Sequence, residues 1–377
     1  MRLSFQKLFF SMATVFAFFA FLILAKSILI PLAFALLLSF ILFPLVKRFE
    51  KWGINKIFSA FLSIFTVFLI FGGVIFLFSS QIIQFSTEFT NFQDKIINSF
   101  ADVTFYINKN VSFFHHLEKD QLFNKMRDWL IESTGVIVTK TFSNTTTFLA
   151  GLVASIIFTF LILLYRNGLI RAFSKFSPEE NKDTILKMYK SVQQVGQKYL
   201  SGMLIVILII GFANSLGLWI IGIDNPILFG FLGAMLSIIP YVGTISGAII
   251  PMLYAFASYE SLWIPLYVAI LFWVVQLITD NILSPKIVGS HIKINAFAAI
   301  LSLIIGASIW GVAGMILFLP FTAMFKVVCE QFEELKPLAL LIGQQNYIEK
   351  DDNNQFNSKW FQKVKGKISA FFKKTKT

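Results

Sequence analysis

Long uncharged runs separated by short charged stretches dominate the pattern of this chain. About 20 apolar residues cross the hydrocarbon core of a bilayer as an α-helix, so an uncharged run of 18 or more residues is a candidate membrane span. Such runs cover residues 8–25, 27–46, 57–87, 141–165, 199–223, 225–259, 261–279 and 294–325. A membrane β-barrel would instead show segments of about 10 residues with alternating hydrophobic and polar positions. The pattern therefore predicts an all-α, polytopic helical membrane protein with about eight hydrophobic segments.

The composition excludes a water-soluble globule. Only 14% of the 377 residues are charged and 56% are hydrophobic, with 46 Phe, whereas soluble domains are about 25% charged. The net charge of +12 would suggest nucleic acid in a soluble chain, but the placement of the charges favours anionic lipid and no nucleic-acid partner. Arg2 and Lys7 before the first run also fit a secretory signal. The second run follows at once, which favours an uncleaved span.

Lysine and arginine near the span ends predict the orientation, because cytoplasmic loops carry an excess of both. They gather between the second and third runs and after the fourth run, at Lys47, Arg48, Lys51, Lys56, Arg166, Arg171 and Lys175. We therefore expect both termini to lie in the cytoplasm. The expected parts are spans 1–3 (1–87), an extracytoplasmic helical segment (88–140), span 4 (141–165), a cytoplasmic amphipathic helix (166–200), a C-terminal membrane core (201–343) and a basic tail (344–377).

The tail has an amphipathic pattern. Residues 350–377 carry eight Lys against two Asp. Aromatic and aliphatic residues fall on one helical face and lysines on the other, which is typical of a helix bound to an anionic cytoplasmic leaflet. A disordered, solubilising tail is the alternative. The expected lipid contacts are Trp360, Phe361, Lys363, Lys367, Lys373 and Lys374.

Two runs are longer than one span requires. Residues 225–259 and 294–325 would measure about 50 Å as straight helices, against a hydrocarbon layer of about 30 Å. Each is either one broken or tilted span, or a re-entrant hairpin of two half-helices. Interrupted apolar segments in corresponding places indicate a transport site, although glycines also permit close helix packing. The candidate path residues in these runs are Pro240, Gly243, Gly247, Gly306, Gly311, Gly314 and Pro320.

Asp280 stands at the end of the 261–279 run. Gln276 precedes it by four residues, so both lie on one helix face. An ionisable group in or near the bilayer is costly and usually faces a cavity, a partner or a proton route. The alternative is a headgroup-level residue that pairs with Lys286. We add Gln276, Asp280, Asn281, Pro285 and Gly289 to the candidate path.

Signatures of enzyme or metal chemistry are absent. The sequence has no phosphate-binding Gly-x-x-x-x-Gly-Lys loop, and Gly243–Gly247 has the wrong spacing for a nucleophile elbow. The single cysteine, Cys329, excludes an internal disulfide, and the three histidines lack zinc-ligand spacing. We expect no enzyme activity, no cofactor and no metal site.

The C-terminal third contains a series of motifs at Ile239–Gly243, Asp280–Gly289, Gly306, Gly311–Gly314, Pro320 and Glu333–Pro337. In this order they resemble the autoinducer-2 exporter family of bacterial membrane proteins, also called PerM-like. The resemblance covers about residues 200–343, and the first two spans are also similar. Family members often have proline where this chain has Ala296, so we expect a less sharp turn there.

The resemblance implies a transporter of the bacterial inner membrane and suggests a homo-oligomer. Our leading hypothesis is a secondary transporter that exports a small polar solute or signal. The alternative within transport is a sodium/proton antiporter with Asp280 as the coupling carboxylate. A non-transporting scaffold or regulatory membrane protein is the alternative from another class.

Overall fold

The computed structural model describes residues 5–70, 148–172, 174–175, 182–239, 242–259, 263–289 and 294–343, with the single positions 72, 73, 76, 79 and 261. These residues form helices and no strand, and an isolated bridge joins Ile294 and Gly343. Five of the described helices are long and apolar enough to cross a membrane, which confirms the all-α polytopic prediction. The expected extracytoplasmic segment (88–140) and basic tail (344–377) lie outside the described residues.

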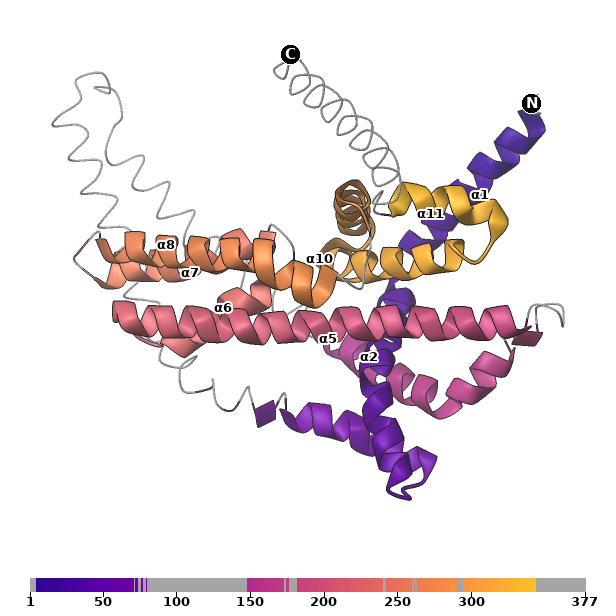
Figure 1. Cartoon of the computed structure of the whole chain (residues 1–377), viewed down its shortest axis with the longest axis horizontal. Helices are drawn as coiled ribbons and strands as arrows, with labels where there is room; N and C mark the ends of the chain where they lie inside the picture. The colour runs from indigo at the N-terminus through magenta and orange to yellow at the C-terminus, as the bar shows by residue number, and fades with distance from the viewer. Residues whose placement is uncertain are drawn as a thin grey trace, which may run out of the picture.

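The helices follow the uncharged runs along the chain (Figure 1). Their bounds are α1 Phe5–Leu24, α2 Lys26–Lys51, an unlabelled helix Lys56–Ile70, an unlabelled helix Phe148–Ala172, α5 Lys182–Ile221, α6 Pro226–Leu236, α7 Val242–Ser258, α8 Trp263–Ile278, the π-helical η3 Thr279–Leu283 and η4 Pro285–Gly289, α10 Ala296–Cys329, the 3₁₀ turn η5 Glu333–Leu335 and α11 Lys336–Ile342.

The first two runs are joined by a bend. One residue, Ala25, separates α1 from α2, with φ −90° and ψ 12°. The Ala25 N–H donates to the Phe21 carbonyl and the Leu29 N–H to the Ala25 carbonyl, both at 2.9 Å, so the helical hydrogen bonds continue across it. Figure 1 shows α2 continuing away from α1 along a bent path. Two antiparallel spans, as the sequence predicts for 8–25 and 27–46, would need a sharper reversal at Ala25.

The 40-residue α5 organises the described structure (Figure 1). At 1.5 Å per residue it is about 60 Å long, so it joins the predicted amphipathic helix and the fifth span without the boundary expected at residue 200. Its first half packs through Val192 and Val195 against a cluster from α2 and α10, and Gly196 faces Phe40. This side of the predicted amphipathic helix is therefore a packing surface.

The second half of α5 is covered by α6, α7 and α8. Leu218 of α5 joins Phe229 of α6, Tyr254 of α7 and Val268 and Phe272 of α8 in one buried cluster. Figure 1 shows α7 and α8 lying along this half of α5. The C-terminal membrane core is thus built on one long helix that carries a different set of helices on each half.

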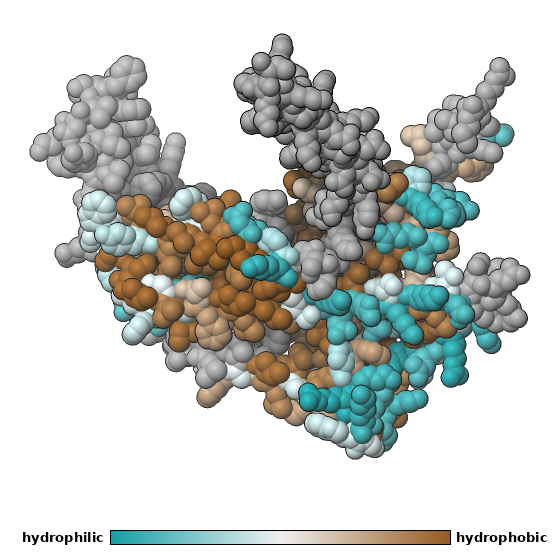
Figure 2. All heavy atoms as spheres, in the orientation of Figure 1, coloured by the Kyte–Doolittle hydropathy of each residue, from teal (hydrophilic) through white to brown (hydrophobic). Residues whose placement is uncertain are grey.

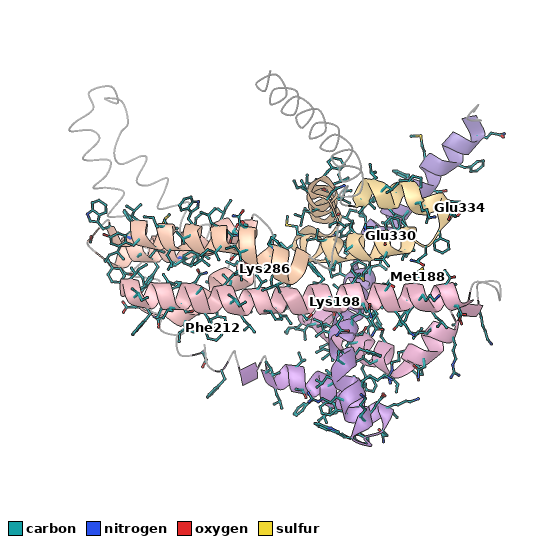
Figure 3. The ribbon with its side chains drawn as sticks, in the orientation of Figure 1. Met188, Lys198, Phe212, Lys286, Glu330 and Glu334 are labelled. Atoms are coloured by element: carbon teal, nitrogen blue, oxygen red, sulfur yellow. The ribbon has the colours of Figure 1, made fainter. Side chains whose placement is uncertain are left out.

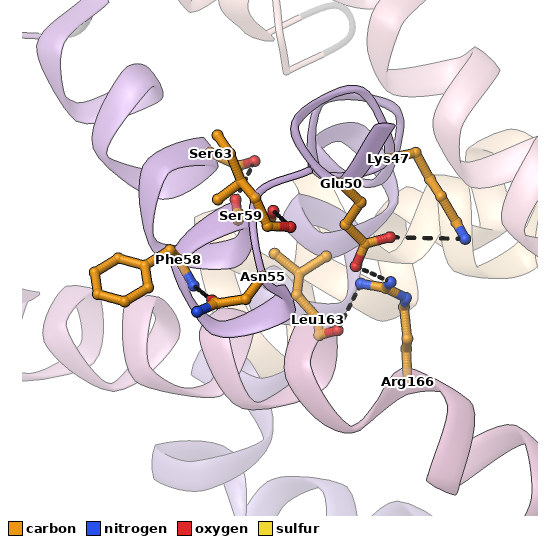
Figure 4. A network of polar contacts seen from close by, with 9 residues as sticks. Lys47, Glu50, Asn55, Phe58, Ser59, Ser63, Leu163 and Arg166 are labelled. Carbon is orange, nitrogen blue, oxygen red and sulfur yellow. Dashed lines mark hydrogen bonds and ion pairs between the residues drawn. The ribbon is translucent and has the colours of Figure 1, made fainter. Parts of the chain in front are cut away.

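A charged cluster joins the end of α2 to the Phe148–Ala172 helix (Figure 4). The Arg166 guanidinium donates to the Glu50 carboxylate and, at 3.0 Å, to the Leu163 carbonyl oxygen. Lys47 Nζ lies 3.8 Å from the same carboxylate. The two basic loops that the sequence places on one side of the membrane therefore lie next to each other.

The surface separates into hydrophobic and hydrophilic regions (Figure 2). Hydrophobic side chains cover the part of this face formed by α7 and α8, and hydrophilic ones gather over the end of α2. A small hydrophilic patch interrupts the hydrophobic region where Figure 3 labels Lys286. Apolar side chains such as Trp273, which is 64% exposed, fit a surface in contact with lipid.

Candidate functional site

The 225–259 run folds back as a helical hairpin. α6 ends at Leu236 and α7 begins at Val242, so the break lies where the sequence predicts it, while Pro240 itself is outside the described residues. A Cβ on Gly243 would lie 1.6 Å from the Leu236 carbonyl oxygen, and a Cβ on Gly247 would lie 2.9 Å from the Gly233 Cα. The two helices touch through their backbones, so close packing explains both glycines.

The 294–325 run also folds back on itself, within α10. Gly311 has φ 61° and ψ −136°, which breaks the helix at a conformation that favours glycine. A Cβ on Gly314 would lie 1.9 Å from the Gly306 carbonyl oxygen, and the hydroxyls of Ser302 and Thr322 are 2.8 Å apart. The halves on either side of Gly311 therefore lie against each other, with Pro320 buried in the second half.

The start of α10 is fixed by a cap. Asn295 Oδ1 accepts a hydrogen bond of 2.8 Å from the Ala298 N–H, and Asn295 Nδ2 donates to the carbonyls of Leu341 and Gly343 at 2.7 and 3.0 Å. Ala296 is the first helical residue, a position where proline and alanine both fit because its N–H has no partner inside the helix. The asparagine cap thus defines this turn without the proline.

Asp280 lies in η3, where the α-helix α8 changes to π-helical geometry. Gln276 Nε2 donates to Asp280 Oδ1 at 2.7 Å, which confirms that the two side chains share a face. Asn281 Nδ2 donates to the Leu277 carbonyl at 2.8 Å. Among the ion pairs of the described residues there is none between Asp280 and Lys286, so the polar partner of Asp280 there is Gln276. Asp280, Asn281, Pro285 and Lys286 are all exposed.

The π-helical segment from Thr279 to Gly289 rests on the middle of α5. Ile287 of η4 packs against Val206, Ile207 and Ile210 of α5. In Figure 3, Lys286 lies beside the part of α5 between the labels of Lys198 and Phe212. This is the level at which α5 changes from amphipathic to apolar sequence, so the segment lies near one end of the apolar half. Local π-helical geometry is rare and often marks functional sites.

The structure divides the sequence-predicted path residues into two groups. Gly243, Gly247 and the Gln276–Gly289 segment belong to the helices on the second half of α5. The α10 hairpin instead packs with α2 on the first half, where Met324 Sδ lies 3.2 Å from a Cβ built on Gly196. The two hairpins are therefore separate elements on one supporting helix.

Asn214 is a polar residue of this region that the sequence analysis missed. It lies in the apolar half of α5 and is 2% exposed. Its Oδ1 is buried and accepts no hydrogen bond from any residue that the structure describes. The available signal was that it is the sole asparagine in the 199–223 run. Within the described part of the chain, no group of three or more His, Cys, Asp or Glu side chains is placed to hold a metal ion.

Comparison with known proteins places these features in a family. The family model described as "AI-2E family transporter" matches residues 9–334. The chain is 34% identical over 138 residues to "Putative transport protein YrrI" of Bacillus subtilis, covering 37% of this chain and 38% of that protein. It is 27% identical over 199 residues to "Putative transport protein" of Borreliella burgdorferi, covering 51% of this chain and 55% of that protein.

A further relative carries a more specific name. The chain is 29% identical over 118 residues to "AI-2 transport protein TqsA" of Escherichia coli, covering 31% of this chain and 34% of that protein. The matched segments thus span between about a third and just over half of these relatives' lengths.

Proposed function

Since the chain belongs to the AI-2E transporter family, whose model matches residues 9–334, we propose that it is an inner-membrane secondary transporter that exports a small polar solute or signal. The observation that carries the proposal is the pair of apolar runs that fold back as hairpins against α5. Interrupted membrane helices of this kind expose backbone carbonyls and half-helix ends, which are the groups that bind solutes and ions in secondary transporters.

The lengths of the half-helices support re-entrant hairpins. α6 has 11 residues, and Ala296–Trp310 forms the first half of α10. At 1.5 Å per residue these measure about 17 and 22 Å, less than a hydrocarbon layer of about 30 Å. In this topology the Asp280–Gly289 segment lies on the cytoplasmic side, together with the basic loops around Lys47 and Arg171.

Asp280 is the proposed coupling residue. A carboxylate can bind and release a proton or a cation, and charge movement near the bilayer can drive a conformational exchange. Asp280 is held by Gln276 on a π-helical segment that contacts α5, so a change in its charge would act on the supporting helix. The same arrangement supports the second candidate, a sodium/proton antiporter.

A flux measurement tests the proposal. Untargeted metabolite profiling of cells with and without the protein identifies the solute, and purified protein in liposomes is then assayed for its movement. Asp280→Asn preserves the shape but removes the titrating group, so we expect loss of proton-coupled flux with normal expression and oligomer size. Asp224→Asn is the matched control, because Asp224 is also exposed but binds Tyr259 at the far end of α5.

Two results would contradict the proposal. If wild-type protein moves no solute, the chain is better explained as a membrane scaffold or regulatory protein. If Asp280→Asn keeps normal flux with the same pH dependence, any coupling residue lies elsewhere. We also propose a homo-oligomer, to be measured by light scattering of the purified protein, and a tail bound to anionic lipid of the cytoplasmic leaflet.

A further inference from the structure

Asn214 lies between two buried apolar clusters of the membrane core. Ile210, one turn before it on α5, belongs to a cluster with Val206, Ile207 and Ala234 of α6. Leu218, one turn after it, belongs to the cluster that includes Phe229, Tyr254 and Phe272. Residues spaced by four share a helix face, so Asn214 points toward the same partners as Ile210 and Leu218. It therefore lies on the side of α5 that α6, α7 and α8 cover.

Small residues bring the helices unusually close at this level. A Cβ on Gly230 of α6 would lie 2.3 Å from Ser215 Oγ, and a Cβ on Gly211 would lie 2.7 Å from the Phe231 ring. Gly233 and Gly247 bring α6 and α7 together in the same region. Such close approach is a packing feature by itself, but here it surrounds a polar side chain rather than an apolar one.

Burial of the Asn214 amide oxygen among apolar side chains is energetically unfavourable. A buried acceptor without a hydrogen-bond donor costs about 1–3 kcal/mol, and a leucine of similar shape would avoid that cost. The neighbouring Ser215 shows the usual solution, because its hydroxyl donates to the Gly211 carbonyl at 2.7 Å. Asn214 Oδ1 has no such partner among the described residues. An unmet buried acceptor of this kind needs an explanation, and a bound ligand is one.

We propose that Asn214 is a ligand contact on the transport path, where its Oδ1 accepts a hydrogen bond from a hydroxyl or amine of a polar solute or coordinates a monovalent cation. A hydroxyl or amine offers a partly positive hydrogen to the amide oxygen, and a monovalent cation offers its full charge. A divalent cation fits the surroundings poorly, because such ions prefer carboxylate ligands and the acids that the structure describes between residues 199 and 325, Asp224 and Asp280, are both exposed. The inference rests on the proposed function and adds to it a binding residue in the helix that carries both hairpins.

The first test asks whether water reaches Asn214. In a Cys329→Ser background, Asn214→Cys is treated with a small water-soluble methanethiosulfonate, and modification is followed by mass spectrometry. The matched control is Leu218→Cys, one turn away on the same face and fully buried. Buried groups react only when the structure opens locally, so a position on a transport path should react at least about tenfold faster than the control. Equal protection of the two positions would overturn the proposal.

The second test separates a ligand contact from a structural one. Asn214→Leu removes the unmet acceptor, so its melting temperature should equal or exceed that of the wild type while solute flux is lost. A lower melting temperature, or unchanged flux, would refute the ligand role. Ser215→Ala is the control, since it removes a neighbouring polar group that already has a partner, and it should keep flux.

Two salt conditions distinguish the two kinds of ligand. If sodium chloride raises the melting temperature of the wild type relative to choline chloride, and Asn214→Leu shows no such rise, the ligand is the cation. Equal melting in both salts assigns the contact to a hydroxyl or amine of the solute. The labelling test does not depend on flux. If the wild type moves no solute, the transport proposal fails, but the accessibility of Asn214 can still be measured.

Discussion

Replacing Glu50 by glutamine should destabilise the protein, because it leaves the positive charge of Arg166 without its partner. Arg166 is 5% exposed, and Glu50 is its partner at the end of α2, with a side chain that is 17% exposed. Glutamine keeps the size and one acceptor but removes the negative charge, so the Arg166 guanidinium would stay buried without a counter-charge. Its remaining contacts are the Leu163 carbonyl and the Phe43 ring, whose centroid lies 5.7 Å from Cζ.

The size of the effect follows from the burial of the two partners. Removing one partner of a buried ion pair costs about 3–5 kcal/mol. Glu50 retains some contact with water, which places the expected loss at about 2–3 kcal/mol, or about 30- to 150-fold in the unfolding equilibrium. Lys47 provides a matched control, because it binds the same carboxylate at 3.8 Å with a side chain that is 50% exposed. Lys47→Gln should cost less than about 1 kcal/mol.

Equilibrium unfolding of the purified protein in detergent micelles measures these differences. A double variant, Glu50→Gln with Arg166→Met, should recover part of the loss, because methionine leaves no unpaired charge in the same volume. If Glu50→Gln costs no more than Lys47→Gln, the pair is not desolvated and the argument fails. If the double variant is less stable than either single variant, packing of the guanidinium dominates over its charge.

Three further predictions concern the hairpins, the topology and the tail. Gly311→Ala should lower thermal stability by about 1 kcal/mol or more, because alanine is strained at positive φ; an unchanged melting temperature would show that the turn adapts. A cysteine at Ser290 in a Cys329→Ser background should resist an impermeant reagent in intact cells and react in inverted vesicles, whereas labelling in intact cells would support single crossings. A 355–377 peptide should bind anionic vesicles. High salt, or substitution of four lysines by glutamine, should abolish this binding, and equal binding to neutral vesicles would refute the electrostatic part. These lysines are Lys363, Lys367, Lys373 and Lys374.

The helical fold could be predicted from the sequence because each span is a local property of a run. Charged residues end the runs. Within the hydrocarbon core of the bilayer, every backbone polar group must form a hydrogen bond inside the protein, and a helix meets this requirement. Relations between runs were harder to predict. The bend at Ala25 has no glycine or proline at that residue. The helix α5 continues through residue 200 because no proline lies near Lys198, and the nearby Gly196 is used for the contact with Phe40. A change of polarity along a helix does not end it.

The fold-back of the two long runs was left open by the sequence and decided by backbone contacts. Glycines at 306 and 314 fit a tilted span, a packing surface and a hairpin equally well. The contact of Gly314 with the Gly306 carbonyl exists only when the chain reverses between them, at Gly311. The sequence signal that could have indicated this is the third glycine, Gly311, which lies between Gly306 and Gly314.

Asn214 shows why a motif such as Asp280–Gly289 can be found in a sequence while a proposed binding position is missed. A single amide among apolar residues carries no spacing rule, because membrane helices tolerate asparagine wherever a neighbouring helix satisfies it. The informative quantity is whether a donor reaches Oδ1, and this depends on three helices that approach from elsewhere in the chain. Ser215, one residue later and equally polar in sequence, is satisfied within its own helix. The distinction between the two residues exists only in the packed structure, so the search for ligand contacts in such chains should begin from buried acceptors without donors as well as from charged residues.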